Sequence, residues 1–231
     1  MDIKELLVEG TTKKVHATSQ SDQVIVEFHE KASGKGAKKA AAEKAAVNNA
    51  VSSFLFEYLE SFNVPTHFVK KLDEKSFLAN RMDMIPMIVA VYNIASKDLA
   101  ERLGIEEGKV LEFPIVEMYY KDAKRKFPMI NEYHAYALGL CDRKEMTSIT
   151  RIATKVNAVL KSFLERKQLR LVRLQMEFGR QQHQIVLGDE ISLDTMLIWP
   201  EDQAGQVKPV DASQMDLNYM REIKARILGE R

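Results

Sequence analysis

Two of three acidic side chains near the ends of two predicted strands have the chemistry to share a metal ion. The stretch LVRLQMEFGRQQHQIVLGDE, residues 171–190, indicates two strands joined by a polar turn, and it contains Glu177, Asp189 and Glu190. Glu177 and Asp189 are predicted to lie close to that turn, so strand pairing would bring both carboxylates to one site. Crowded carboxylates repel unless a cation neutralises them, and Mg²⁺ does so while also binding phosphate oxygens. The alternative is a hairpin with a polar face toward solvent.

Two glycine–lysine segments have the composition of phosphate-binding turns. Gly10-Thr11-Thr12-Lys13 lies at a predicted strand–strand turn, and Ser33-Gly34-Lys35-Gly36 lies in a predicted flexible loop. Small residues let backbone N–H groups approach an anion closely, and a lysine adds a point charge. Neither segment has the G-x-x-x-x-G-K-[ST] spacing of a P-loop, so the alternative is a solvated loop that carries lysines.

The apolar segment MDMIPM, residues 82–87, is a candidate for contact with a base. Pro86 lacks an N–H group and interrupts strand pairing, so neighbouring backbone groups could face the edge of a ring such as adenine. An ordinary edge strand is the alternative.

Alternating apolar residues predict the strands that must position these groups. Strands are expected over LLVEG, KKVHAT and DQVIVEF, and again from Thr66 to Ile94 with a turn at residues 73–75 and a break at Pro86. Residues 109–142 have a mixed, aromatic pattern.

Helical periodicity predicts the remaining elements. One helix is expected from Val47 until Pro65 ends it, a short one over KDLAERL up to Gly104, a third over 143–168, and a fourth in the tail from Asp211. The order of elements favours an α+β fold of two lobes with a cleft between them. The predicted lobes are residues 1–85, rich in sheet, and residues 86–231.

Composition excludes several classes of protein. The 231 residues are 45% apolar and 29% charged with a net charge of +1, so no long-range field draws the chain to nucleic acid or anionic lipid. Cys141 is the only cysteine, which excludes an internal disulfide and predicts a reducing compartment, the cytoplasm. The first residues lack the pattern of a secretory signal, and no apolar run is long enough for a membrane span.

The same segments, taken in order, resemble the SAICAR synthetase family of purine-pathway ligases. The likeness runs from about Leu6 to Trp199 and is carried by EGTTKKV, SGKGAK, KAAVNN, VPTHF, MDMIPM, LAERLGIEEG, FPMINE, MEFG and VLGDE. The resemblance implies a cleft in which a smaller glycine-rich β lobe covers ATP and a larger α+β lobe supplies Mg²⁺ ligands. It also implies ligation of L-aspartate to carboxyaminoimidazole ribonucleotide, through an acyl phosphate formed with ATP, to give SAICAR.

The resemblance assigns the nucleotide half of this cleft residue by residue. Glu177 and Asp189 match the carboxylates that meet Mg²⁺ or ATP, and they are the catalytic and metal-binding candidates. Thr11 replaces the first lysine of the family's Gly-Lys-x-Lys turn, so one phosphate contact is lost. The implied ATP contacts are two lysines and the linker beside adenine, namely Lys13, Lys121, Asp83, Met84 and Pro86.

Departures from the family pattern concentrate on the acceptor half. The family's R-x-R, its small-Gly-Ser turn and its Asp-x-Lys are replaced here by Tyr92, Ile94, Lys97, Asp98, Arg173 and Gln175. Three further charged positions of the family carry Lys35, Phe127 and Leu197. Each lost charge-assisted hydrogen bond weakens the binding of an anionic acceptor by about 1.5–3 kcal/mol, although Arg173 could supply positive charge from a new place.

Three hypotheses follow. The chain is the family ligase, a diverged paralogue that joins another carboxylate and amine, or a catalytically silent protein that binds nucleotide or acts by interaction. The expected partners are small-molecule substrates, a nucleotide and an amino acid, with no nucleic acid and no membrane. Self-association in the family implies a homo-oligomer, for which the apolar stripes of 143–168 and 214–228 are candidates, with a core role as the alternative.

Overall fold

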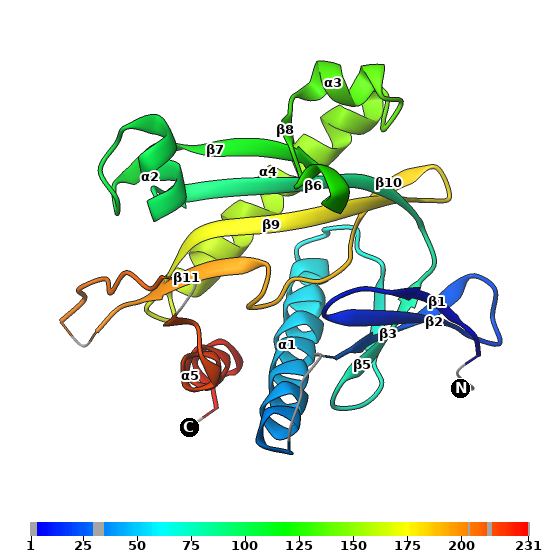
Figure 1. Ribbon diagram of the computed structural model, residues 1–231, viewed down its shortest axis with the longest axis horizontal. Helices are drawn as coiled ribbons and strands as arrows, with labels where there is room; N and C mark the ends of the chain where they lie inside the picture. The colour runs from blue at the N-terminus through cyan, green and yellow to red at the C-terminus, as the bar shows by residue number, and fades with distance from the viewer. Residues whose placement is uncertain (1–3, 30–34, 203, 212–213, 231) are drawn as a thin grey trace.

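The smaller of two antiparallel sheets is built from the first eighty residues. The computed structural model describes residues 4–29, 35–202, 204–211 and 214–230 (Figure 1). The sheet order is β1-β2-β3-β5-β4, formed by β1 Leu6–Glu9, β2 Lys13–Ala17, β3 Gln23–Phe28, β5 Ser76–Asn80 and β4 Phe68–Lys71. The predicted turn at 73–75 is confirmed, since the Asp73 carboxylate accepts hydrogen bonds from the backbone N–H groups of Lys75 and Ser76.

The larger sheet has the order β10-β9-β6-β7-β8, with β11 beside β9. Its strands are β6 Asp83–Ile94, β7 Val110–Tyr120, β8 Met129–Ile130, β9 Leu169–Gln181, β10 Gln184–Gly188 and β11 Met196–Pro200. The predicted hairpin of residues 171–190 is confirmed as β9 and β10. The predicted break at Pro86 is wrong. β6 continues through it, and the missing N–H is accommodated where the pairing with β9 shifts register between Met84 and Ile88.

Helices cover the sheets and account for the rest of the described chain. They are α1 Lys35–Ser61, α2 Lys97–Leu103, the 3₁₀ helix η1 Ala123–Arg125, α3 Glu132–Ala137, α4 Arg143–Glu165 and α5 Leu217–Leu228. The predicted helix ends at Gly104 and near residue 143 are confirmed, the latter by a capping box of Asp142 and Glu145. α1 begins well before the predicted Val47, and α5 begins after its cap Asp216 rather than at Asp211.

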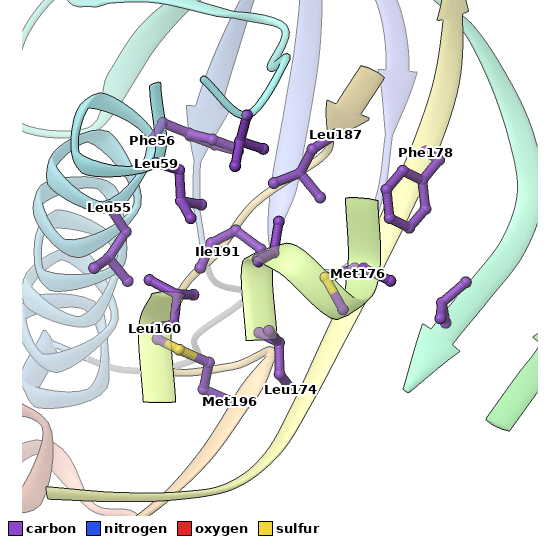
Figure 2. Packing of buried hydrophobic residues seen from close by; sticks show 14 of the residues in the cluster. Leu55, Phe56, Leu59, Leu160, Leu174, Met176, Phe178, Leu187, Ile191 and Met196 are labelled. Carbon is purple, nitrogen blue, oxygen red and sulfur yellow. The ribbon is translucent and has the colours of Figure 1, made fainter. Parts of the chain in front are cut away.

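One continuous apolar core joins both sheets. Figure 1 shows α1 between the smaller sheet and α5, while α4 packs against β9 and β6 of the larger sheet. Figure 2 shows how the core side chains of these elements meet, among them Leu55, Phe56, Leu59, Leu160, Leu174, Met176, Phe178, Leu187, Ile191 and Met196. Burying each such side chain stabilises the fold by about 1.5–3 kcal/mol. The shared core therefore holds the two sheets against each other.

The apolar stripes of α4 and α5 belong to this core. Ile149, Val156 and Leu160 of α4 are fully buried, as are Ile223 and Ile227 of α5. Of the two interpretations of these stripes, the core role is therefore the correct one. None of the described helices has the length and apolar character needed to cross a membrane.

Candidate active site

Lys13 is the centre of a buried charge cluster where the two sheets meet. Its ammonium group, on β2 of the smaller sheet, lies 2.5 Å from Asp189 Oδ2 and 2.7 Å from Glu190 Oε1, both just beyond β10. Burial alone would lower the pKa of Lys13, but the two carboxylates outweigh burial and raise it. The cluster therefore holds a permanent positive charge between two acids.

Glu177 joins the cluster through the strand register. It lies opposite Gly188 on the neighbouring strand, so Asp189 follows directly after its cross-strand partner. Both acids thus stand at the end of the hairpin away from its turn, and the prediction that they lie close to the turn is wrong. Regular alternation would turn the side chains of Glu177 and Asp189 to opposite faces, because Glu177 pairs with Gly188. Asp189 instead lies just beyond β10 with a left-handed φ of 59°, so it does not follow that alternation.

Lys121 provides the second cation of the cluster. Its ammonium group lies 2.5 Å from Glu177 Oε2, and its backbone N–H donates to the Pro86 carbonyl. Burial and the charge of Asp189 raise the pKa of Glu177 against the opposing effect of Lys121. Burial also opposes ionisation of Asp189, but Lys13 and Lys121 hold its pKa below the ordinary value. The four side chains therefore act on one another as one electrostatic unit.

Two members of the site were absent from the predicted set. His67 lies buried behind Asp189, hydrogen-bonds the Asp189 backbone, and has its pKa lowered to about 4 by burial. It supports Asp189 in a left-handed backbone conformation with a φ of 59°. Glu190 is buried, and its Oε2 atom has no hydrogen-bond partner among the described residues. The adjacency of Glu190 to Asp189 was a signal in the sequence, whereas nothing there marked His67.

A cavity of about 450 Å³ lies beside the charge cluster. Its apolar walls include Val15, Val24 and Val26 of the smaller sheet, Met82 just before β6 and Met84 in β6. Lys121, Asp189 and His67 line its polar part. An apolar compartment next to fixed charges is what a planar base followed by phosphates requires, and the volume is ordinary for a small-molecule site.

The side chains of two predicted adenine-linker residues, Asp83 and Pro86, are not part of the described cavity lining. Asp83 is 77% exposed at its side chain and lies 3.3 Å from Arg180 Nη1 on the outer surface. Pro86 is outside the described lining of the 450 Å³ cavity, and it acts through its carbonyl, which fixes the backbone of Lys121. Met84 is thus the member of this predicted trio whose side chain borders the cavity.

Two glycines make room for the methionine that closes this cavity. A Cβ atom on Gly188 would lie 1.7 Å from Met82 Cε, and one on Gly179 would lie 2.8 Å from Met82 Sδ and 2.9 Å from the Asp83 carbonyl. The glycines of MEFG and VLGDE are therefore required by the close approach of Met82.

A second cavity, of about 570 Å³, collects several of the altered acceptor positions. Lys97, Asp98, Arg173 and Leu197 line it together. Tyr92 and Ile94 are buried beside it, with the Tyr92 hydroxyl 3.4 Å from Asp98 Oδ2 and Ile94 packed in one cluster with Trp199.

The remaining predicted positions lie apart from that cavity. Phe127 is 43% exposed in the connection between η1 and β8, where its φ is 50°, and Gln175 is half-buried on β9. Thr11 lies in the β1–β2 turn close to Lys13. The predicted loop of residues 33–36 falls outside the described residues except for the backbone of Lys35 and Gly36, which begins α1.

The donor set at Glu177 and Asp189 fits Mg²⁺. Carboxylate oxygens are ligands that this ion prefers, and it needs one or two of them when phosphate oxygens and water complete its shell. The uncompensated Oε2 atom of Glu190 adds negative potential at the same place. Across the part of the chain that the structure describes, no three or more histidine, cysteine or acidic side chains are grouped to hold a metal ion by themselves.

The arrangement of two antiparallel sheets around these cavities is the fold of a known group of enzymes. A solved SAICAR synthetase in complex with ADP superposes with a TM-score of 0.87 and 36% identity, covering 98% of this chain and 99% of that one. The crystal structure of phosphoribosylaminoimidazole-succinocarboxamide synthase from Ehrlichia chaffeensis superposes with a TM-score of 0.85 and 29% identity, covering 98% and 100%.

Sequence relationships specify the family within that fold. The SAICAR synthetase family model matches residues 6–228. Phosphoribosylaminoimidazole-succinocarboxamide synthases of Chlorobium limicola and Prosthecochloris aestuarii are 43% and 40% identical over 97% and 99% of this chain, and 98% and 99% of their own lengths. The chain belongs to the SAICAR synthetase family, a family of purine-biosynthesis ligases, and the α+β fold implied by its motifs is confirmed.

Proposed function

We propose that this chain is an ATP- and Mg²⁺-dependent ligase that joins L-aspartate to carboxyaminoimidazole ribonucleotide to give SAICAR. The observation that carries the proposal is the meeting of Lys13, Asp189, Glu177 and Lys121 beside the apolar 450 Å³ cavity. These residues come from both sheets, so a ligand at this junction is held by the whole fold. With a single cysteine, Cys141, the chain suits the reducing cytoplasm.

The nucleotide would bind with its base in the apolar part of that cavity. Val15, Val24 and Val26 offer one face to a planar ring, and Met82 and Met84 offer the other. Phosphates would then extend toward Lys13 and Lys121, the two cations beside the cavity. Both lysines form ion pairs with carboxylates of the chain itself. Their ammonium groups are therefore already oriented toward the position that the phosphates would occupy.

Mg²⁺ held by Glu177 and Asp189 would supply positive charge to the phosphate oxygens. Each lysine would then exchange a carboxylate partner for a phosphate oxygen, while Mg²⁺ would take the place of the lysines beside Glu177 and Asp189. Lys13 keeps Glu190 as a second partner at 2.7 Å, which holds its ammonium group in place during this exchange.

The reaction has two bond-forming steps. An oxygen of the imidazole carboxylate attacks the γ-phosphorus of ATP, the bond to ADP breaks, and an acyl phosphate forms. The amine nitrogen of aspartate then attacks the acyl carbon, phosphate leaves, and the nitrogen loses one proton. The role of Lys13 and Lys121 is to stabilise the negative charge that gathers on the transferred phosphoryl group.

An ADP-release assay tests the proposal. We expect release in the presence of ATP, Mg²⁺, L-aspartate and carboxyaminoimidazole ribonucleotide, with omission of any one abolishing it and mass spectrometry detecting SAICAR. Glu177→Gln should lower kcat at least about 100-fold because it removes a charged ligand at the phosphates. The matched control is Glu57→Gln on the exposed side of α1, which should be unchanged. ADP release that is indifferent to aspartate would refute the assignment of substrates.

A further inference from the structure

The larger sheet divides where β6 and β9 separate (Figure 1). Toward the start of β9, Arg173 is the last residue that pairs with β6, through Tyr92, and on its other edge it pairs with Leu197 of β11. Beyond this point β9 continues beside β11, while β6 continues beside β7 as far as the pair of Ile94 and Val110. A cavity of about 360 Å³ lies in this division and is lined by residues of all four strands.

The wall of this 360 Å³ cavity is largely apolar. Its apolar residues are Ile94, Val110, Leu171, Trp199, Val207 and Pro209. Leu171 and Trp199 are each 2% exposed and form the deep part, whereas Val110 is 67% exposed and stands at the opening. Gly108 leaves the opening clear, because a Cβ atom at that position would have no other atom within 4 Å. An apolar cavity that opens to solvent suits a ligand with an apolar body.

Two of the polar side chains in the lining already have partners. Asn93 Nδ2 donates to Asn157 Oδ1 at 2.8 Å, and Asn157 Nδ2 donates back to Asn93 Oδ1 at 2.9 Å. Arg170 Nε donates to a carboxylate oxygen of Glu201, and Arg170 Nη1 lies 3.4 Å from Glu165 Oε1. The charge of Arg170 is therefore balanced by two acids of the chain itself.

Lys161 of α4 is the remaining cation of the lining. Its side chain is half-buried, and it forms no ion pair or hydrogen bond with any of the described residues. Glu165 stands one helical turn further on, but its carboxylate is directed to Arg170. A half-buried ammonium group without an acid is unfavourable, and a ligand that brings a negative charge would relieve it.

The 360 Å³ cavity is separate from the two cavities of the candidate active site. Among the described lining residues, it shares none with the 450 Å³ cavity and only Trp199 with the 570 Å³ cavity. The Trp199 indole N–H donates to the Val210 carbonyl at 3.1 Å, so its ring is fixed as the partition between the 360 Å³ and 570 Å³ cavities. Trp199 is also the single tryptophan of the chain, and its fluorescence therefore reports on a ligand in the 360 Å³ cavity.

We propose that the 360 Å³ cavity is a further binding site, which takes a small monocarboxylate with an apolar body. The body would lie against Leu171 and Trp199, and the carboxylate would pair with the ammonium group of Lys161. A single negative charge is favoured, because a second one would face the carboxylate of Glu165. This site does not depend on the proposed ligase reaction, and its test requires no turnover.

Titration of the full chain with 4-bromobenzoate tests the site. Bromine quenches tryptophan fluorescence on contact, so we expect saturable quenching of Trp199, also when Mg²⁺ and a non-hydrolysable ATP analogue fill the nucleotide site. Lys161→Met should weaken binding about 5- to 10-fold, as expected of one charge-assisted contact that water partly screens. Lys144→Met, on the exposed side of the same helix, is the matched control and should bind like the unaltered chain.

Two uncharged or doubly charged probes test the chemical class of the ligand. The neutral 4-bromobenzamide should bind equally well to the unaltered chain and to Lys161→Met, because it has no charge for the ammonium group. The dianion 4-bromophthalate should bind the unaltered chain more weakly than 4-bromobenzoate does. Tighter binding of the dianion would overturn the preference for a single charge.

Other outcomes would overturn the site itself. One is the absence of saturable quenching up to the solubility limit of 4-bromobenzoate, and another is an affinity within twofold of normal in Lys161→Met. Lys97 lines the 570 Å³ cavity, so a loss of affinity in Lys97→Met as large as in Lys161→Met would place the probe there instead. Circular dichroism and the thermal midpoint check that Lys161→Met is folded. Val110→Phe, which narrows the opening at an exposed position, should also weaken binding and provides a second variant.

Discussion

Replacing Lys13 by methionine should destabilise the protein in a manner that depends on pH. Lys13 Nζ lies 2.5 Å from Asp189 and 2.7 Å from Glu190, and the exposed fractions of the three side chains are 14%, 22% and 3%. Removing one partner of a buried ion pair costs about 3–5 kcal/mol because the remaining charge is left uncompensated. The residual exposure of Asp189 lets water relieve part of this, so we expect a loss of about 3 kcal/mol at pH 7.

The pH dependence identifies the cause of that loss. In the unaltered chain the pKa of Asp189 is held below its ordinary value, so its contribution to stability is present above the unfolded pKa and is lost as pH falls. Without Lys13 the pKa of Asp189 should rise above that of the unfolded chain, and the pKa of Glu190, which burial already raises, should rise further. The two carboxyls then favour folding only when protonated. The stability difference between the two proteins should therefore shrink as the pH is lowered from 7 toward 4.

Urea unfolding followed by the fluorescence of Trp199, the single tryptophan and a buried one, measures both quantities. The control is Lys14→Met on the same strand, whose ion pair with Glu9 is 3.9 Å long and largely exposed, so its effect should stay within about 0.5 kcal/mol. Adding Glu190→Gln to Lys13→Met should restore part of the stability. A loss below about 1 kcal/mol, or one that is constant from pH 7 to pH 4, would show that the reasoning about the buried cluster is wrong.

Two further predictions concern the groups that surround this cluster. Gly179→Ala should lower the free energy of unfolding in urea by about 1–3 kcal/mol, because its Cβ would lie 2.9 Å from the Asp83 carbonyl. Gly188→Ala meets only the movable end of Met82, so it should chiefly weaken nucleotide binding in a titration. Equal stability losses in the two variants would contradict this reasoning. His67 has a pKa of about 4 in the folded chain and about 6.5 in the unfolded chain, so it contributes stability above pH 6.5 that is lost as the pH falls. Between pH 7 and pH 5 the unaltered chain should therefore lose about 2 kcal/mol of stability relative to His67→Gln. Parallel curves of stability against pH for the two proteins would contradict the burial of a neutral imidazole.

Strand positions and the α4 helix were predictable because their patterns are strong and local. The alternation of β2 and β3 follows a half-buried sheet, and the stripe of α4 continues over six turns from a capping box at Asp142. The hairpin of β9 and β10 was predictable for the same reason. Its register, which places Glu177 opposite Gly188, was not, because the position of the two-residue turn at Gln182 and His183 depends on their left-handed backbone conformations.

The start of α1 was misjudged for a physical reason. The stretch around Ala41 and Ala45 has few large apolar residues, so it showed no helical stripe, yet alanine and lysine are strong helix formers. Ala41 and Ala45 are buried, and Glu43 forms an ion pair with Arg221 of α5. Small side chains permit that close packing of the two helices, and the partner helix lies more than 170 residues away in the sequence, where no local pattern reveals it.

Candidate site residues were identified from their types, but their pairings were not. Lys13 and Asp189 are 176 residues apart, and Lys121 and Glu177 are 56 apart. Which lysine meets which acid depends on how the smaller sheet is placed against the larger one, and that placement is decided by the shared apolar core. His67 escaped notice since a lone histidine beside phenylalanines gives no signal until its backbone contact with Asp189 is known.

The ion pairs of this site connect stability to function. Lys13 belongs to the smaller sheet and its acids to the connection after β10, so this contact ties the two sheets together at the edge of the 450 Å³ cavity. A phosphate chain with Mg²⁺ carries both signs of charge and can replace the lysine–carboxylate contacts on both sides at once. The same junction would then be held by the ligand instead of by the protein alone. Nucleotide without the metal would leave the carboxylates without a cation, and the metal without nucleotide would leave the lysines without an anion. Binding of both together should therefore stabilise the fold more than the binding of either one separately.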